Sequence, residues 1–147
     1  MAESQKKQVY RRFVEEVINK GNLSVIPELY HPDYLDHSAP PGAPQGGSVY
    51  DQVAAIPKLF RGAFPDVHFT IEEMVEDGDW VATRVTGRAQ HLGRPFMGVN
   101  PTGRHIAWSS LGFFRMKDGK IIEAWNEFDA WGMMQQLTGP APMKIKQ

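Results

Sequence analysis

Residues 105–128 read HIAWSSLGFFRMKDGKIIEAWNEF, and this stretch decides the fold class. The strand-like pattern that begins at Val67 continues here, and two strands are expected, from His105 to Met116 and from Ile121 to Phe128. The dipeptide Asp118-Gly119 between them favours a hairpin turn. The stretch therefore predicts two antiparallel strands near the end of the chain.

A second pair of strands is expected just upstream. From Val67 onward the pattern alternates, with Phe69, Ile71 and Glu73 on one face of a predicted strand. Asp77-Gly78 has the composition of a hairpin turn and leads into a further strand from Trp80 to His91. The chain thus ends in about four antiparallel strands.

Helical spacing comes before the strands. Val9, Phe13 and Val17 recur at helical intervals within the first twenty residues. A short second helix is predicted from Ser24 to Tyr30, with Ser24 as its cap. Helices that precede an antiparallel sheet indicate an α+β domain.

A long loop and a third helix connect these parts. Residues 31–47, HPDYLDHSAPPGAPQGG, are rich in proline and glycine and are predicted to be mostly irregular. The third helix is expected to open at Ser48, where Ser-Val-Tyr-Asp resembles a capping box. Pro57 should bend or divide that helix because proline removes one helical hydrogen bond.

Composition limits the classes of function. The 147 residues fit one domain, and 41% hydrophobic with 22% charged residues is ordinary for a globular chain. Sixteen Lys and Arg residues against 17 Asp and Glu residues give a net charge of −1. This balance provides no positive electrostatic potential that would attract nucleic acids or anionic membranes, so neither is expected as a partner. Without cysteine, disulfides and thiolate metal sites are excluded. A single domain, 1–147 with a core of about 8–139, in the cytoplasm is expected.

Three motifs carry a family resemblance. The runs HPDYLDH, HLGRPFMGVNPTGR and DGKIIEAWNEFDAWGMMQQL, in this order, resemble the SnoaL-like polyketide cyclases (ester cyclases) of the nuclear-transport-factor-like superfamily. The resemblance implies a cone-shaped fold, with three N-terminal helices packed on a curved, mainly antiparallel sheet that encloses a pocket. It also implies homo-oligomers built on sheet faces and cofactor-free acid–base chemistry.

Two residues depart from the pattern that the resemblance implies. Asn126 stands where the cyclases have an acid–base aspartate, and Gly112 stands where they have a nearby histidine. Asparagine does not exchange a proton near neutral pH, although it donates and accepts hydrogen bonds. Cyclisation through a carboxylate at position 126 is therefore not expected.

The register of the last hairpin has two alternatives. A type I turn with a glycine bulge places Ser110 opposite Asn126, whereas a plain two-residue turn places Leu111 there. The first alternative puts small, aromatic and amide side chains on one face, as in a ligand wall: Trp108, Ser110, Gly112, Ala124, Asn126 and Phe128.

Three charged or titratable residues are further catalytic candidates beside Asn126. Asp129 is either the cap of a closing helix from Ala130 to Leu137 or a carboxylate at the pocket rim. Arg84 lies within a strand and is either exposed or directed inward, where it would need a partner such as Asp129 or Glu123. For Asp36 and His37 there are two alternatives: Asp36 accepts a local turn hydrogen bond and the His37 imidazole is exposed, or His37 is a candidate for proton transfer.

Candidate ligand contacts come from the aromatic and methionine content, because pockets are lined mainly by such side chains. They are Tyr34, His91, Phe96, Met97, Trp108, Ser110, Trp125 and Phe128. The five histidines do not have the spacing of a metal site, so neither a metal nor a cofactor is predicted.

The function predicted from the sequence is acid–base chemistry on a hydrophobic carbonyl compound, of polyketide or terpenoid type. Cyclisation, isomerisation and hydrolysis stay open. Two alternatives are a pocket that binds without catalysis, favoured by Asn126, and an oligomerisation module. A homodimer is expected because the predicted strands carry apolar residues on both faces.

Overall fold

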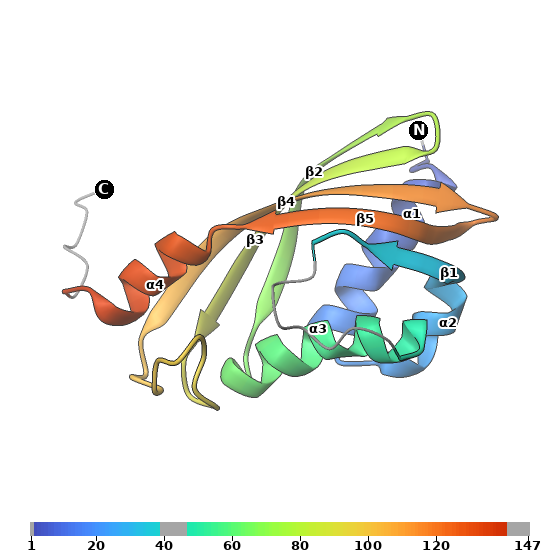
Figure 1. Cartoon of the computed structure of the whole chain (residues 1–147). Coiled ribbons are helices and arrows are strands. Elements are labelled where there is room, and N and C mark those ends of the chain that lie inside the picture. Colours follow the sequence, from blue (N-terminus) through green and yellow to red (C-terminus); the bar gives the residue numbers. More distant parts are fainter. Residues whose placement is uncertain (1, 39–46, 141–147) are drawn as a thin grey trace.

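Five strands form one curved sheet over a layer of helices. The computed structural model describes residues 2–38 and 47–140. The strands are β1 (Tyr30–Asp36), β2 (His68–Asp77), β3 (Trp80–Gln90), β4 (His105–Lys117) and β5 (Lys120–Phe128), in the order β1-β5-β4-β3-β2. Only β1 pairs in parallel, with β5. The α+β prediction and the cone shape are confirmed (Figure 1).

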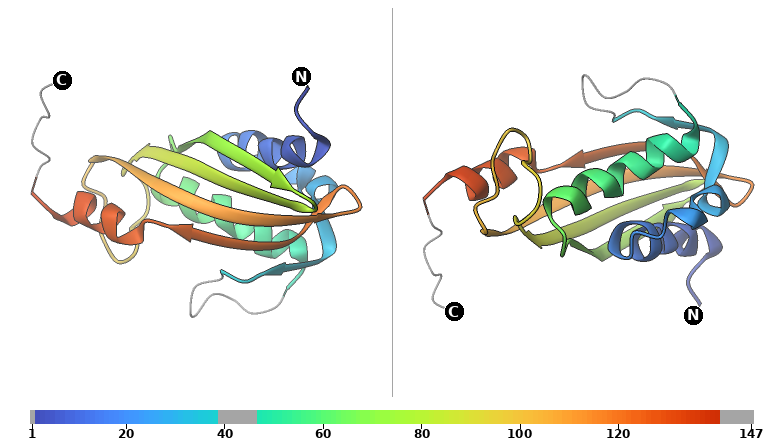
Figure 2. Two further views of the ribbon diagram at one scale, coloured as in Figure 1. Left: turned by 90° about the horizontal axis from the view of Figure 1, so that it is seen from above. Right: turned by 90° about the horizontal axis from the view of Figure 1, so that it is seen from below.

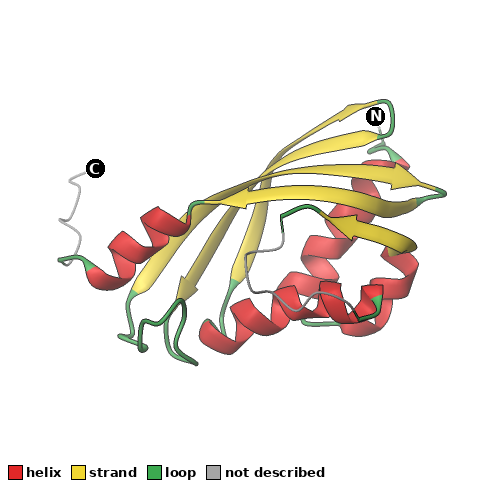
Figure 3. Ribbon diagram, viewed as in Figure 1, coloured by secondary structure: helices red, strands yellow, loops and turns green. Residues whose placement is uncertain are grey.

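Most of the described helices lie beneath the sheet, and the last one lies beyond the end of the final strand (Figure 3). The helices are α1 (Gln5–Arg12), which continues as the π-helix η1 (Phe13–Asn19), the 3-10 helix η2 (Leu23–Val25), α2 (Ile26–Leu29), α3 (Val49–Ala63) and α4 (Ala130–Thr138). Figure 2 shows α3 running along the underside of the sheet, whereas α4 extends away from the other helices at the end of β5. The covered, concave face of the sheet is therefore the one that can hold a pocket.

The second predicted helix is present but consists of two short pieces, η2 and α2, and it begins and ends one residue earlier than expected. It begins with the single turn η2, and the side chain of Asn22, not Ser24, caps it by accepting from the Ser24 backbone N–H. Proline at the start of α2 suits the first helical turn, where no backbone N–H is needed. Tyr30 already belongs to β1, because its backbone is extended.

Strand β1 corrects the prediction of a loop from residue 31. It pairs with β5 at Leu35 and Asp36, and its register is irregular between Tyr30 and Leu35. Pro32 lies in this irregular part of an edge strand, which is where a sheet tolerates proline. The rest of the predicted loop, residues 39–46, lies outside the described residues.

Helix α3 confirms the capping box and not the division at proline. Ser48 Oγ accepts from the Asp51 N–H, and the Asp51 carboxylate accepts in return from Ser48. The helix continues through Pro57, which is buried on the same face as Val53 and Phe60. Packing of this apolar face compensates for the helical hydrogen bond that proline removes.

A β-bulge in β2 changes the face predicted for Glu73. The pairing with β3 shifts between Ile71 and Glu73, so that Met74 follows Phe69 and Ile71 toward the core. Glu73 is exposed on the opposite face instead. A bulge inserts one residue into the period of two, and alternation in the sequence does not reveal it.

The last hairpin has a register that neither predicted turn produces. Asp118 and Gly119 both have positive φ, of 53° and 74°, as in the plain two-residue turn. Just after the turn, Ile122 forms a bulge in β5, because Met116 pairs with Ile121 whereas Arg115 pairs with Glu123. Asn126 therefore lies opposite Gly112 rather than Ser110 or Leu111.

The predicted face of that hairpin is nevertheless confirmed. The observed pairing of Asn126 with Gly112 differs from the bulged-turn prediction, Ser110, by two residues, and a shift of two preserves the face on which a side chain lies. Trp108, Ser110, Asn126 and Phe128 accordingly share the concave side of the sheet.

Two hydrophobic clusters fill the space between the layers. Phe13, 7% exposed, belongs to the cluster under β3, β4 and β5, and Phe60, 8% exposed, belongs to the cluster near α4. None of the described helices combines the length and apolarity needed to cross a membrane, and the cytoplasmic location stays a prediction.

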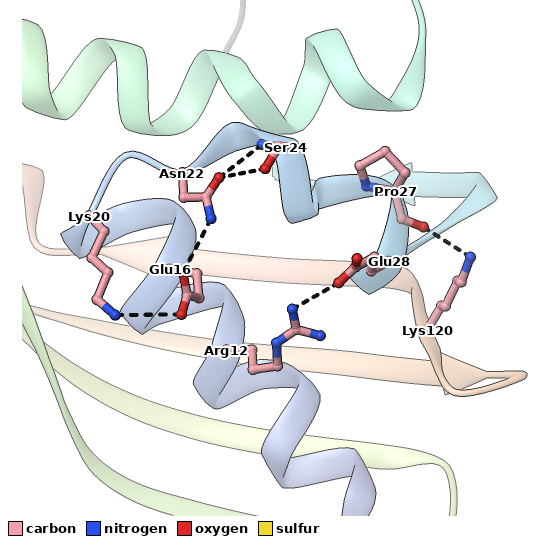
Figure 4. A network of polar contacts seen from close by, with 8 residues as sticks. All are labelled: Arg12, Glu16, Lys20, Asn22, Ser24, Pro27, Glu28 and Lys120. Atoms are coloured by element: carbon pink, nitrogen blue, oxygen red, sulfur yellow. Dashed lines mark hydrogen bonds and ion pairs between the residues drawn. The ribbon is translucent and has the colours of Figure 1, made fainter.

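Polar contacts at the helical end tie the layers together (Figure 4). The Arg12 guanidinium lies 2.8 Å from the Glu28 carboxylate, which joins α1 to α2. Lys120 donates to the Pro27 carbonyl at 2.9 Å and so connects α2 to the start of β5. These contacts fix the closed end of the cone.

Candidate functional site

A cavity of about 150 Å³ lies between the concave face of the sheet and helices α1, η1 and α3. Half of its lining residues are aromatic, namely Tyr10, Phe13, Phe60, Phe69, Trp108, Phe114 and Phe128. The Phe60 and Trp108 rings stack with an interplanar angle of 11°, and Phe69 meets Trp108 edge-on. Such walls suit a flat apolar ligand.

The polar groups of the cavity gather where β1, β4 and β5 meet. They are the side chains of Asp36, Ser38, Ser110 and Asn126. Asp36 Oδ1 accepts from the Ser38 N–H at 2.8 Å, as the turn interpretation of Asp36 predicted. The Asn126 backbone N–H donates to Ser38 Oγ, which joins the end of β1 to β5.

Asp36 is the one carboxylate that lines this cavity among residues 2–38 and 47–140. The tyrosines nearby are neutral at ordinary pH. Burial raises the pKa of Tyr34, and the negative charge of Asp36 raises it further. Burial also raises the pKa of Tyr10 to about 12, although its hydrogen bond with Thr83 opposes that shift. Among the described residues that line the cavity, Asp36 is therefore the candidate for proton transfer.

His37 lies on the opposite, convex face of the sheet. Its ring stacks on Trp125 at a centroid distance of 3.9 Å and an angle of 8°, and Nε2 lies 2.7 Å from Glu123 Oε1. The prediction that His37 transfers a proton in the pocket is wrong, because its side chain lies outside the cavity. Successive residues of an extended chain point to opposite faces, so Asp36 and Ser38 enter the cavity and His37 does not.

Arg84 and Asp129 also lie outside the cavity. Arg84 is exposed on the convex face and donates to Glu73 Oε1 at 2.7 Å, so the inward pair with Asp129 or Glu123 does not form. Asp129 is exposed and caps α4, where its Oδ1 accepts from the Gly132 N–H at 2.8 Å. The capping interpretation of Asp129 is confirmed.

Of the eight expected ligand contacts, Trp108, Ser110 and Phe128 line the cavity. The other five have different positions. Tyr34 packs edge-on against Tyr30, and Trp125 lies on the convex face beside His37.

The remaining three belong to the loop after β3. His91 is fully buried, with Nε2 2.9 Å from the Arg94 carbonyl. Phe96 is buried against Phe64, while Met97 is 52% exposed. This loop folds on itself through the Phe96–Val99 bridge and packs beside the cavity rather than into it.

Sequence reasoning did not place Asp36 and Ser38 in the site. The signal was present in the period of two that runs through Tyr34, Asp36 and Ser38. The prolines on both sides concealed it, because they favour irregular structure.

The convex face carries a cluster of exposed apolar side chains, here called the outer-face patch. It consists of Val75, Trp80, Ala82, Leu111, Phe113 and Trp125, from β2 to β5. Leu111 and Phe113 are each 56% exposed. A contiguous apolar surface of this kind is unusual on a monomer.

Comparison with known proteins agrees with this architecture. A family model described as SnoaL-like polyketide cyclase matches residues 8–137. Aklanonic acid methyl ester cyclase DnrD of Streptomyces peucetius is 29% identical over 132 residues, covering 90% of each chain. Nogalonic acid methyl ester cyclase of Streptomyces nogalater is 29% identical over 126 residues, covering 84% of this chain and 91% of that one.

Solved structures show the same fold. TsrD from Streptomyces laurentii has a TM-score of 0.81 at 22% identity, covering 95% of this chain and 99% of its own. IdmH from Streptomyces antibioticus has a TM-score of 0.77 at 32% identity, covering 91% of this chain and 99% of its own.

Proposed function

Because this chain belongs to the SnoaL-like polyketide cyclase family, we propose that it is a cofactor-independent enzyme that transfers a proton within a hydrophobic carbonyl compound. The position of Asp36 carries the proposal. Its carboxylate lines an aromatic cavity together with the amide of Asn126 and the hydroxyl of Ser110. This is a base beside hydrogen-bond donors, which is the arrangement that enolate chemistry needs.

The reaction starts with removal of a proton from the carbon next to a carbonyl. Asp36 accepts that proton, and the carbonyl oxygen, now an enolate, accepts hydrogen bonds from Asn126 and Ser110. In a cyclisation the enolate carbon attacks a second carbonyl of the same molecule, and Asp36 returns the proton to the new alkoxide. In an isomerisation the proton returns to a different carbon. Atoms and charge balance in both, and no cofactor takes part.

The size of the cavity limits the substrate. At about 150 Å³ it is smaller than most ligand pockets, which hold roughly 300–1,000 Å³. A cavity of this size suits a compact substrate of one or two rings. Larger molecules extend past Phe128, which is 41% exposed.

Hydrogen exchange at carbon tests the proposal directly. We expect the protein to catalyse exchange of the α-hydrogens of 2-tetralone, a two-ring ketone, in D₂O, as followed by NMR. Asp36→Asn should lower kcat by roughly 10²–10⁴ and leave binding of the ketone in place. Asp33→Asn is the matched control, because the Asp33 side chain is 84% exposed on the same strand.

A binding pocket without catalysis is the second candidate. The amide at Asn126, where the resemblance implies an acid–base aspartate, favours it. In that case 2-tetralone binds, but its exchange rate equals the rate without protein and Asp36→Asn has no effect on it.

We also propose that two copies of the chain pair through the outer-face patch. The patch combines two exposed aromatic rings, Phe113 and Trp125, with the half-buried ring of Trp80 and aliphatic side chains on a broad sheet face, and water contacts these groups in the monomer. Pairing would bury on the order of 1,200–2,000 Å² in total, as in other stable dimers.

A further inference from the structure

The segment Asp36-His37-Ser38 has side chains on both faces of the sheet. Asp36 and Ser38 line the cavity, and His37 between them contacts the convex face. Because His37 is bonded directly to both cavity residues, contacts that fix the imidazole also restrict the positions of Asp36 and Ser38. The placement of His37 thus bears on the site although its side chain is outside it.

Within residues 2–38 and 47–140, the end of β1 has few other attachments. It is an edge strand whose only neighbour in the sheet is β5, with an irregular register before Leu35. Beyond Asp36 the His37 N–H donates to the Ala124 carbonyl at 3.0 Å, and Ser38 Oγ accepts from the Asn126 N–H. Edge segments with so few hydrogen bonds open locally unless side chains hold them.

The His37 side chain supplies such an attachment in two ways. Its ring lies flat on Trp125, and its Nε2 bonds to Glu123 Oε1 at 2.7 Å. Glu123 is itself held, because Arg115 Nε donates to Glu123 Oε2 at 2.7 Å from β4. The imidazole thus connects β1 to β5 and, through Glu123, to β4.

Charge strengthens this connection. The hydrogen bonds from Arg115 and then from His37 hold the pKa of Glu123 below its usual value, so the carboxylate is ionised at neutral pH. A hydrogen bond to an ionised group is stronger than one between neutral groups.

We propose that His37 is a positioning residue that holds the Asp36 carboxylate against the cavity from the far side of the sheet. The inference rests on the proposed role of Asp36 as the base. Proton transfer is sensitive to placement, and a displacement of about 1 Å can lower a rate by roughly 10²-fold. The aromatic walls do not depend on His37, so substrate binding should be little affected.

Three substitutions separate the two contacts. His37→Ala removes both the stacking and the hydrogen bond, His37→Phe keeps the stacking alone, and Glu123→Gln keeps a neutral hydrogen-bond acceptor. In the 2-tetralone exchange assay we expect His37→Ala to lower kcat by about 10- to 100-fold with KM within about twofold of the wild type. The kcat values of His37→Phe and Glu123→Gln should lie between those of the wild type and His37→Ala.

The matched control is His105→Ala, which removes an exposed histidine from β4. It should leave both constants at the wild-type values. All variants are compared at the same association state, measured by sedimentation, because Trp125 belongs to the outer-face patch.

A second measurement does not depend on catalysis. The Asn126 backbone N–H donates to Ser38 Oγ, so its exchange with D₂O reports whether the end of β1 stays attached. His37→Ala should increase the exchange rate of this amide at least tenfold and leave the amides of the β3–β4 ladder unchanged.

The outcomes separate the two proposals. Wild-type kcat in His37→Ala overturns the positioning role, and so does a loss of kcat with no change at the Asn126 amide. If the wild type shows no exchange that depends on Asp36, the proposed function fails, and the Asn126 amide alone then decides whether His37 holds β1. Equal loss in His105→Ala also overturns the positioning role.

Discussion

Asn126 and Gly112 are cross-strand partners on the concave face, and the amide of Asn126 occupies the space that a side chain at position 112 would need. A Cβ atom on Gly112 would lie 2.6 Å from Asn126 Oδ1 and 2.6 Å from Phe114 Cε2. Cβ atoms do not approach other non-hydrogen atoms this closely, because the atoms repel each other at such distances. A side chain at position 112, such as the histidine that the resemblance implies, would therefore require the side chains of Asn126 and Phe114 to move.

Asn126→Asp should not restore a cyclase-type site. The new carboxylate would lie in the cavity that already holds Asp36, with Gly112 rather than a histidine opposite it. Like charge and burial both raise the pKa of a carboxyl. A group with a raised pKa contributes its stability at low pH and loses it as pH rises through that pKa.

We therefore expect the variant to be close to wild type in urea unfolding near pH 4 and less stable near pH 7. Asn126→Ala serves as the control, because it changes the side chain without a charge. A gain in 2-tetralone exchange in Asn126→Asp would contradict this account.

Phe13→Ala and Phe60→Ala should each lower the free energy of unfolding by about 3–5 kcal/mol, since each removes a buried ring from a cluster. Leu59→Ala is the control, because Leu59 is 54% exposed on the same helix as Phe60. Urea midpoints measure all three. Losses below about 1 kcal/mol for the phenylalanine variants would remove these rings from the core.

Stability should fall at acid pH partly through Glu123. Its pKa is lowered in the folded protein by the hydrogen bonds of Arg115 and His37. A group with a lowered folded pKa contributes stability above its unfolded value of 4.5, and that contribution is lost as pH falls through the folded pKa.

Urea unfolding between pH 3 and 6 should therefore show a shallower pH dependence in Glu123→Gln than in the wild type. Glu127→Gln is the matched control, since Glu127 is an exposed residue of the same strand. Identical slopes for the wild type and Glu123→Gln would show that the lowered pKa does not contribute to stability.

The outer-face patch should make the protein a dimer at micromolar concentration. Phe113→Glu places a charge at the centre of the patch and should give a monomer in sedimentation velocity. Tyr50→Glu, on exposed surface of α3, should leave the dimer intact. A monomeric wild type would show that the patch stays in contact with water.

The sequence by itself determined the features that depend on neighbouring residues. The period of two in β3, β4 and β5, the turns at Gly78 and Gly119 and the capping box at Ser48 are local, and all agree with the structure. The face shared by Trp108 and Asn126 was predictable for the same reason, because a strand presents every second residue to the same side.

Only the tertiary structure decided the composition of the site. Strand β1 exists because it pairs with β5, whose residues are far away in the chain, and proline-rich flanks give no local sign of that partner. This pairing turns Asp36 into the cavity and His37 onto Trp125. Two bulges have no local sign either: the one at Ile122 sets which residue lies opposite Asn126, and the one in β2 sets the face of Glu73.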